Sequence, residues 1–151
     1  MFMNLRGHVG LTLTVLMSVF IATRSRLESW VLFTALSIMT SSLPDIDLRL
    51  KLPHRKYTHN LLFILITSIF FGYITSLLLN NFTLGFLSTL SSGLLHLLGD
   101  LMTYIGFAPF YPISGRMVAL RLFKSDNKFI NNLMLFTGMI LLTYYVVGMS
   151  Y

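Results

Sequence analysis

Cysteine is absent from the 151-residue chain, and charged residues are scarce. Without cysteine there is no disulfide bond, thiolate zinc site or cysteine nucleophile, so histidine nitrogens and carboxylate oxygens must bind any metal. Charged residues make up only 11% of the chain, against about a quarter of a typical soluble domain. With 55% hydrophobic residues and a mean hydropathy of +0.76, the chain cannot cover its surface with polar groups, which indicates a membrane protein.

Several other signatures are missing as well. The chain contains no internal repeat, no low-complexity segment, no glycine-rich phosphate loop and no Ser-His-Asp pattern. Its formal charge of +6 is confined to a few short segments, which favours membrane lipids and phosphate-bearing ligands as partners over nucleic acid. We expect contacts with lipid headgroups and no direct nucleic-acid binding, while the oligomeric state stays open.

Five apolar runs predict an all-α, polytopic bundle of about five transmembrane helices, a single integral-membrane domain over residues 1–151. The runs are residues 9–23, 30–43, 60–80, 82–99 and 133–151. The third is the clearest, because it has 21 residues without a charge and about 20 cross the hydrocarbon layer. The second has only 14 residues and should end before Pro44. The first is expected to be a retained helix, because no small-residue cleavage pattern follows it.

The cations predict the orientation in the cell (inner) membrane. With five crossings, the N-terminus and the segments after the second and fourth helices share one side, and the other side carries only Arg24 and Arg26. The excess of Lys and Arg on the first side predicts that this side, with the N-terminus, is cytoplasmic. Its nine cations are Arg6, Arg49, Lys51, Arg55, Lys56, Arg116, Arg121, Lys124 and Lys128.

Every histidine and all four aspartates fall on that same side, although Asp126 stands among basic residues and is expected to be a solvated charge. Asp45 and Asp47 are two positions apart, so both carboxylates should project the same way from an extended segment. His96 and Asp100 are an i, i+4 pair on one helical face. Together these residues predict a metal site at the cytoplasmic face. The candidate ligands are His8, Asp45, Asp47, His54, His59, His96 and Asp100.

The two central histidines are spaced for a loop that runs into a helix. His54 and His59 are five positions apart, which is poor for one helical face. The spacing suits one ligand in the loop and a second at the start of the third helix. Thr58 would then be available as the N-cap of that helix.

Each of these residues also has a simpler interpretation. A single histidine in an apolar run is more often a hydrogen-bonded structural group than a ligand, and His8 could be such a residue. Asp45 could cap a helix or pair with Arg49, and Lys56 fits a role in setting topology. His96 is the exception, because an ionisable group at membrane depth is costly and usually faces a functional interior.

Seven candidate ligands exceed the three or four protein groups that bind one catalytic zinc. Two ions sharing a carboxylate of Asp45 or Asp100 would account for this number, and mixed nitrogen and oxygen ligation suits zinc first, then manganese or iron. Such a site activates water for phosphoester hydrolysis. Asp45 and Asp47 are then the candidate catalytic carboxylates, and Arg55 is placed to bind a phosphate with two hydrogen bonds.

A basic stretch near the C-terminus completes the candidate substrate site. Arg121, Lys124 and Lys128 are spaced i, i+3, i+7, which predicts an interfacial helix whose cationic stripe meets lipid headgroups. The candidate substrate-binding residues are Arg55, Thr58, Arg116, Arg121 and Lys124.

Four sequence blocks resemble the YdjM-like family of inner-membrane metal-dependent hydrolases, over about residues 7–121. They are Gly7-His8, Leu43-Pro44-Asp45-Ile46-Asp47, His54-Arg55 with Thr58-His59, and His96, Asp100, Thr103 and Gly106 leading to Pro112. The resemblance implies a small helical membrane protein with a His/Asp metal site and hydrolytic activity. Leu48, Lys56 and Asn60 depart from the His, Gly and Ser that are usual in the family.

The preferred hypothesis is a membrane-embedded metal-dependent hydrolase that acts on a phosphoester, of a lipid or a related substrate, at the cytoplasmic face. The alternative is a non-catalytic metal-binding membrane protein that recruits or regulates a cytosolic partner. A metal carrier is disfavoured, because the polar residues gather at one face and no acidic path continues through the first, third and fifth helices.

Overall fold

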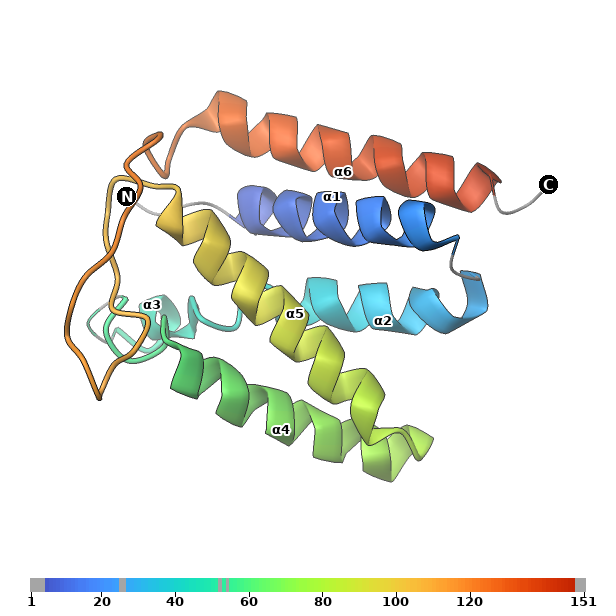
Figure 1. The fold of residues 1–151 in the computed structure, drawn as a ribbon, viewed down its shortest axis with the longest axis horizontal. Coiled ribbons are helices and arrows are strands. Elements are labelled where there is room, and N and C mark those ends of the chain that lie inside the picture. The colour runs from blue at the N-terminus through green and yellow to red at the C-terminus, as the bar shows by residue number, and fades with distance from the viewer. Residues whose placement is uncertain (1–4, 25–26, 52, 54, 149–151) are drawn as a thin grey trace.

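Helices make up most of the part of the chain that the structure describes (Figure 1). The computed structural model describes residues 5–24, 27–51, 53 and 55–148, and within this part of the chain it has helices and isolated bridges but no strand. The prediction of an all-α membrane bundle is confirmed. The helices are α1 (Leu5–Thr23), α2 (Leu27–Thr40), α3 (Ile46–Arg49), α4 (Leu61–Leu79), α5 (Phe82–Leu101) and α6 (Lys128–Gly148).

Four helices, α1, α4, α5 and α6, are long and apolar enough to cross a membrane, and α2 is a shorter apolar helix. This agrees with about five predicted crossings. α2 ends at Thr40 rather than at the predicted residue 43, because the chain turns there: the Leu43 amide donates to Thr40 O at 3.0 Å, and the Ile46 amide donates to Leu43 O at 3.0 Å. Pro44, which cannot donate, lies inside this turn.

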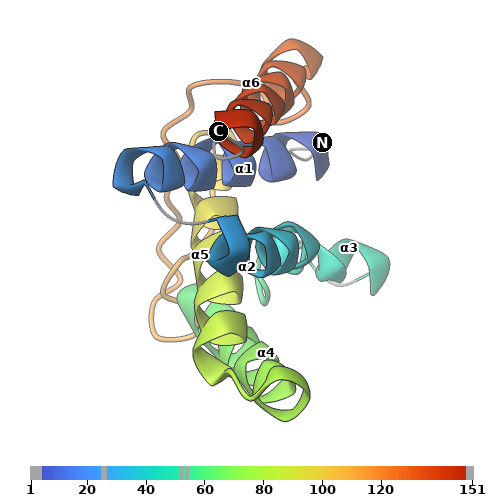
Figure 2. The ribbon, with the colours of Figure 1, turned by 90° about the vertical axis from the view of Figure 1, so that its right-hand side faces the viewer.

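α5 is the central helix of the bundle, because it packs against α1, α2 and α4. Figure 2 shows α6, α1, α2 and α4 one above another, with α5 crossing from α1 to α4. The buried side of α5 is rich in small residues, among them Gly85, Ser88, Ser92 and Gly93. In lipid the hydrophobic effect does not drive helices together, so helix association depends on close packing, which small residues allow. One such contact joins Ser92 Oγ to Thr40 Oγ1 of α2 at 2.7 Å.

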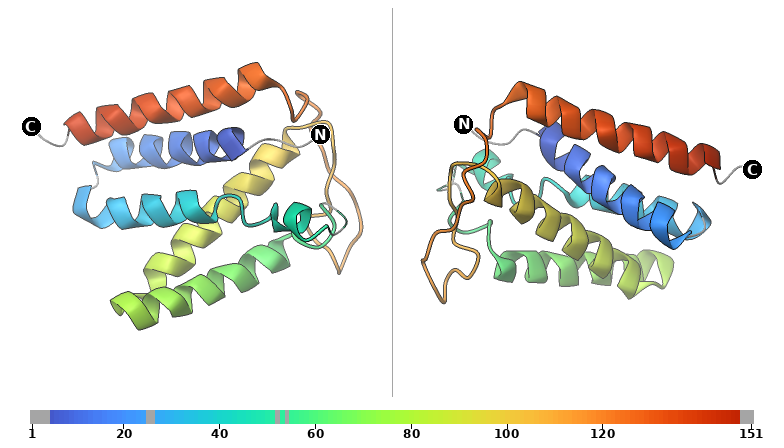
Figure 3. Two further views of the ribbon diagram at one scale, coloured as in Figure 1. Left: turned by 180° about the vertical axis from the view of Figure 1, so that it is seen from behind. Right: turned by 45° about the horizontal axis from the view of Figure 1, so that its top comes forward.

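α1 and α6 form a second close pair, visible in both panels of Figure 3. Their backbones meet at Gly10, where an added Cβ would lie 2.3 Å from the amide nitrogen of Leu135. Gly138 of α6 faces the same crossing, since its Cβ would lie 2.8 Å from Gly10 O. Only glycine permits this approach.

Three connecting segments lie at one end of the molecule. Figure 1 places the start of α1, the region around α3 and the connection between α5 and α6 at the end opposite the α1–α2 and α4–α5 turns. The candidate metal ligands lie at this same end: His8 near the start of α1, Asp45, Asp47 and His59 between α2 and α4, and His96 and Asp100 near the end of α5. The fold therefore brings residues that are far apart in sequence to one end of the helices.

The α5–α6 segment (residues 102–127) is extended rather than helical. Thr103 bridges to Phe123, Phe107 bridges to Val118, and the amides of Leu120 and Leu122 donate to carbonyls at the end of α5. Amides bonded in this way cannot form helical i→i−4 bonds.

The prediction of an interfacial helix with Arg121, Lys124 and Lys128 on one stripe is therefore wrong. Arg121 has a φ of 56°, outside the helical region, and α6 begins only at Lys128. The basic residues lie instead along an extended chain.

Candidate metal centre

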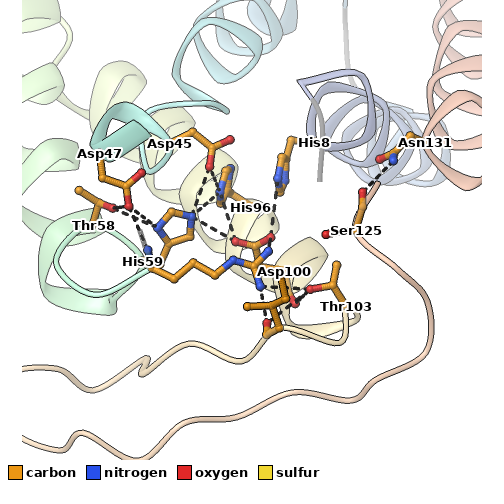
Figure 4. A network of polar contacts seen from close by, with 12 residues as sticks. His8, Asp45, Asp47, Thr58, His59, His96, Asp100, Thr103, Ser125 and Asn131 are labelled. Carbon is orange, nitrogen blue, oxygen red and sulfur yellow. Dashed lines mark hydrogen bonds and ion pairs between the residues drawn. The ribbon is translucent and has the colours of Figure 1, made fainter. Parts of the chain in front are cut away.

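Five of the predicted metal ligands meet in one buried cluster (Figure 4). His8 comes from α1, Asp45 from the turn before α3, His59 from the segment before α4, and His96 and Asp100 from α5. All are buried except Asp45, whose side chain is 18% exposed. The cluster therefore opens to the outside along Asp45.

Four donor atoms in this cluster lie close together, with His59 and His96 each near both Asp45 and Asp100. His59 Nε2 lies 3.3 Å from His96 Nε2, 3.4 Å from Asp45 Oδ1 and 3.2 Å from Asp100 Oδ2. His96 Nε2 lies 3.7 Å from Asp45 Oδ1 and 3.6 Å from Asp100 Oδ2. A tetrahedral zinc ion with bonds of about 2.0–2.1 Å separates its ligands by about 3.3 Å. The measured separations fit such an ion.

The polar atoms and charges of the cluster also fit a cation. Asp100 Oδ2 is buried, and the nearest polar atoms are ring nitrogens, His59 Nε2 at 3.2 Å and His96 Nε2 at 3.6 Å, which can share a cation with it. Three carboxylates, Asp45, Asp47 and Asp100, face one guanidinium, Arg55, so the described groups carry two excess negative charges when the imidazoles are neutral. A divalent ion would neutralise them.

His96 is held in the tautomer that a metal requires. Its Nδ1 lies 2.7 Å from the carbonyl oxygen of Ser41, at the end of α2. A carbonyl only accepts, so Nδ1 carries the proton and Nε2 points its lone pair at the other donors. Metal-binding histidines commonly have this second hydrogen bond, which fixes ring and tautomer.

His59 is oriented in a similar way by Asp47. His59 Nδ1 lies 3.0 Å from the Thr58 hydroxyl and 3.5 Å from Asp47 Oδ2, which is on the opposite side of the ring from the donor cluster. The same oxygen accepts from Thr58 Oγ1 at 2.8 Å and from the Arg55 amide at 3.0 Å. Asp47 therefore supports His59 from behind, as carboxylates do in carboxylate–histidine–metal arrangements.

Two local predictions for this region are wrong. The carboxylates of Asp45 and Asp47 do not project the same way, because the chain enters the helical turn α3 directly after Asp45 instead of staying extended. Thr58 is not the N-cap of α4, since Asn60 takes that place and accepts from the Phe63 amide at 2.9 Å. The Thr58 hydroxyl binds Asp47 instead.

His8 lies beside the four-donor cluster. Its ring stacks on that of His96, with centroids 3.7 Å apart and planes at 8°. Its Nε2 is 3.9 Å from Asp100 Oδ1, and neither ring nitrogen has a hydrogen-bond partner among the described residues. His8, His96 and Asp100 form a second possible donor group, but His96 Nε2 can bind only one ion and Asp100 Oδ1 already binds Arg55, so a second cation would depend mainly on His8.

Arg55 faces inward. Its Nη2 donates to Asp100 Oδ1, and its Nη1 donates to Thr103 Oγ1 at 3.1 Å and to Ile105 O. The guanidinium therefore balances the charge of Asp100 and ties the segment before α4 to the α5–α6 segment. Its predicted role as a phosphate clamp would require it to leave some of these partners.

The electrostatic surroundings shift the pKa values of the loop residues. Burial by itself lowers the pKa of His59, but hydrogen bonds to Asp100 and Asp45 outweigh it and raise the pKa above its ordinary 6.5. Burial raises the pKa of Asp45, yet the hydrogen bond with His59 and the nearby His96 hold it below its usual range. Burial also lowers the pKa of Arg55, which the nearby carboxylates only partly offset.

The remaining predicted site residues lie elsewhere. Thr58 is buried against Asp47, whereas Arg116, Arg121 and Lys124 are exposed on the α5–α6 segment. His54 lies outside the described residues.

Two contributors to the site were not predicted. The Ser41 carbonyl holds His96, and the Thr103 hydroxyl binds Arg55. A backbone carbonyl leaves no signal in the sequence. Thr103 did stand in the fourth of the family-like blocks, seven residues after His96.

The family comparison agrees with the resemblance seen in the four sequence blocks. The sequence model of a family described as YdjM inner membrane protein matches residues 3–151, essentially the whole chain. No curated protein and no solved structure matches it. The family description supports a location in the inner membrane, as do the four long apolar helices.

Proposed function

This chain belongs to the YdjM family of inner membrane proteins, and we propose that it is a metal-dependent hydrolase acting on a phosphoester, of a lipid or a related substrate, at the cytoplasmic membrane face. The metal is a divalent ion, zinc before manganese or iron. The observation that carries the proposal is the convergence of His59 Nε2, His96 Nε2, Asp45 Oδ1 and Asp100 Oδ2 within 3.2–3.7 Å in each measured pair.

The donor types favour a catalytic ion over a purely structural one. Structural zinc sites in proteins are mostly built from cysteine, whereas catalytic sites use histidine and carboxylate. When bound in such a site, a divalent ion polarises a phosphoryl oxygen and supplies an activated water. Asp45 is the partly exposed member of the set, so substrate would approach along its carboxylate.

The surrounding residues would support this chemistry. Asp47 acts through His59, holding the ring so that Nε2 faces the ion. Arg55 keeps Asp100 charged and oriented, and part of its guanidinium could turn to an incoming phosphate. His8 offers a donor for a second ion. That ion could bind if Asp100 Oδ1 left its contact with Arg55 and bound metal instead.

A lipid-borne phosphate is the favoured substrate class, because the cluster lies at one end of the membrane-crossing helices. Arg116, Arg121 and Lys124 are exposed at that end. The nine-to-two distribution of cations supports a cytoplasmic position for this end.

A second candidate function is metal binding without catalysis, in a protein that recruits or regulates a cytosolic partner. Asp45, His59, His96 and Asp100 together could supply all four donors of a tetrahedral ion. In an enzyme, one protein donor must leave the ion, or the ion must accept a fifth ligand, before water can bind. A regulator can keep all four protein donors on the ion.

The two candidates can be separated on full-length protein purified in detergent. Elemental analysis first gives the metal and its stoichiometry. The protein is then loaded with Co²⁺, whose visible spectrum reports its ligands, and titrated with inorganic phosphate. A spectral change with hydrolysis in a phospholipid and pyrophosphate screen supports the enzyme. An unchanged spectrum without hydrolysis supports the regulator, and absence of bound metal overturns both.

The orientation is tested separately. Single cysteines at Lys51 and Arg116, both exposed, can be labelled in intact cells or inverted vesicles, since the chain has no cysteine of its own. Labelling of both from the cytoplasmic side is expected. Labelling of positions 51 and 116 from opposite sides of the membrane would contradict a site formed at one membrane face.

A further inference from the structure

The turn of the α5–α6 segment presents large apolar side chains to the outside. Phe107 and Val118 exchange hydrogen bonds of 3.2 and 2.9 Å, which closes residues 108–117 into a loop. Within this 108–117 loop, Ile113 is 94% exposed, Met117 64% and Phe110 60%. Exposed apolar patches often mark a contact surface, and three large apolar side chains are exposed within the ten residues of this loop.

The depth of this loop is fixed by α4. α4 has 19 residues and is therefore about 28 Å long, close to the thickness of the hydrocarbon layer. Its first residue, Leu61, consequently lies near the hydrocarbon boundary. The Leu61 amide donates to the carbonyl of Pro109 at 2.9 Å, which places the 108–117 loop at the same depth.

Aromatic contacts agree with an interfacial position. The ring of Tyr111, in the loop, meets the ring of Tyr57 edge to face, with centroids 5.7 Å apart. Tyrosine is enriched where hydrocarbon meets headgroups, because its ring is apolar and its hydroxyl polar. Both tyrosines lie beside the start of α4.

The charge of the α5–α6 segment indicates which kind of surface the 108–117 loop contacts. From residue 101 to residue 125 the sequence contains no Asp or Glu but contains three cations. All three, Arg116, Arg121 and Lys124, are exposed. Basic residues beside exposed apolar ones match an anionic lipid leaflet, where lipid phosphates attract the cations and acyl chains cover the apolar groups.

We propose that the 108–117 loop is a membrane-contact element that inserts Phe110, Ile113 and Met117 into the anionic leaflet beside α4. Arg116 and Arg121 contact lipid phosphates next to the inserted side chains. The inference stands independently of hydrolysis, because it uses only the loop, its depth and its charge.

A fluorescent label at a single cysteine tests the insertion. Ile113→Cys is suitable because the residue is almost fully exposed, and the chain supplies no competing cysteine. Leu77→Cys, on the exposed side of α4, is the lipid-facing control, and Lys51→Cys, after α3, is the water-facing control. Each protein carries an environment-sensitive fluorophore and is reconstituted into vesicles of phosphatidylcholine with or without phosphatidylglycerol.

The label at position 113 should show blue-shifted emission and quenching by brominated acyl chains, as at position 77, and both effects should be larger with phosphatidylglycerol. Water-like emission and no quenching, as at position 51, would overturn the proposal. Shielding that appears only when a cytosolic extract is added would also overturn it and assign the loop to a protein partner.

The charge contribution is tested in the same labelled protein with Arg116→Gln and Arg121→Gln combined. The additional quenching caused by phosphatidylglycerol should disappear, while insertion into phosphatidylcholine persists. An unchanged dependence on phosphatidylglycerol would overturn the role given to the two arginines.

Discussion

The Nε2 atoms of His59 and His96 face each other at 3.3 Å, although the two residues are 37 positions apart. His96 Nδ1 donates to Ser41 O, so its Nε2 brings a lone pair to this contact. Two imidazole lone pairs at that separation repel each other unless a cation or a shared proton lies between them. Asp45 and Asp100 place carboxylate oxygens next to this contact, so the site attracts positive charge: a proton on His59 in the metal-free protein, or a metal ion in its place.

The first prediction is that His59→Ala and His96→Ala each abolish tight metal binding. Each removes one nitrogen donor, and loss of the ion leaves Asp45 and Asp100 without a compensating charge. Loss of an outer-shell partner typically costs about 10–100-fold in metal affinity, and loss of a ligand should exceed that range. Metal content after purification and titration against a chelator measure the effect.

Asp126→Ala is the control for these variants. Asp126 is a partly exposed carboxylate in the α5–α6 segment, and none of the four donor atoms comes from it. It should keep the wild-type stoichiometry. Full metal binding by both histidine variants would show that the cluster is structural and that the metal assignment is wrong.

The second prediction separates Asp45 from Asp47. Asp45→Asn removes a ligand charge and should lose the metal, whereas Asp47→Asn should keep the stoichiometry and weaken affinity by about 10–100-fold. The difference follows from position, because Asp47 contacts the far nitrogen of the His59 ring. Equal losses in the two variants would place Asp47 among the ligands.

The long helices were predictable because an apolar run of about 20 residues has few alternatives to a helix inside lipid. α4, at Leu61–Leu79, lies within one residue of the predicted run at each end. α6 begins at Lys128, five residues before the predicted start at residue 133. Its first turns hold Asn131 and Asn132, and hydropathy alone does not recognise a polar helical turn.

The membrane side of each segment was enough to predict which residues form the site, but not how their side chains are arranged within it. Hydropathy and charge place His59 and His96 at one end of the bundle, since the topology sorts their segments together. The inward direction of Arg55 and the position of Asp47 behind His59 depend on ring orientation and on a single turn of helix. Spacing in the sequence does not determine either.

The third prediction concerns the α1–α6 crossing. Gly10→Ala places a Cβ 2.3 Å from the Leu135 amide nitrogen and 2.6 Å from its Cα, and backbone cannot move aside unless α6 shifts. Overpacking of this kind costs about 1–3 kcal/mol. Thermal unfolding in detergent should reveal a lower midpoint. Gly148→Ala is the matched control, because its Cβ meets nothing within 4 Å; equal midpoints would contradict the close crossing.

The fourth prediction is the pH dependence of metal binding. A metal competes with a proton for His59, whose pKa lies above its ordinary 6.5 in the metal-free protein. Affinity should therefore fall as the pH decreases, beginning above 6.5, while Asp45, whose pKa is lowered, stays ionised. Chelator competition from mildly alkaline to mildly acidic pH measures this, and a flat profile would contradict it.

The metal-free protein should show the opposite trend in stability. A group whose folded-state pKa is raised contributes stability below its unfolded value and loses it as the pH rises through the folded value. Thermal unfolding of the metal-free protein should thus occur at lower temperature as the pH rises through the raised pKa of His59. Addition of metal should reverse the slope. The same slope with and without metal would indicate that His59 does not bind the ion.

The last prediction distinguishes a positioning role of Arg55 from a phosphate clamp. An ammonium in Arg55→Lys can keep the contact with Asp100 but cannot also reach Thr103 Oγ1 and Ile105 O, which the guanidinium binds together. Metal stoichiometry should persist, since an arginine has no lone pair to offer a metal. Stability should fall by about 1–3 kcal/mol, because buried acceptors lose their donor.

Turnover then decides between the two roles. If the guanidinium binds a substrate phosphate, phosphoester hydrolysis per bound metal should fall in Arg55→Lys even at temperatures where the variant is fully folded. If Arg55 only positions Asp100, hydrolysis per bound metal should stay near the wild-type value while stability falls. Lys56→Ala is the control, because its cation is adjacent and exposed and should affect neither measurement. Loss of metal from Arg55→Lys would instead show that the charge balance at Asp100 needs the complete guanidinium.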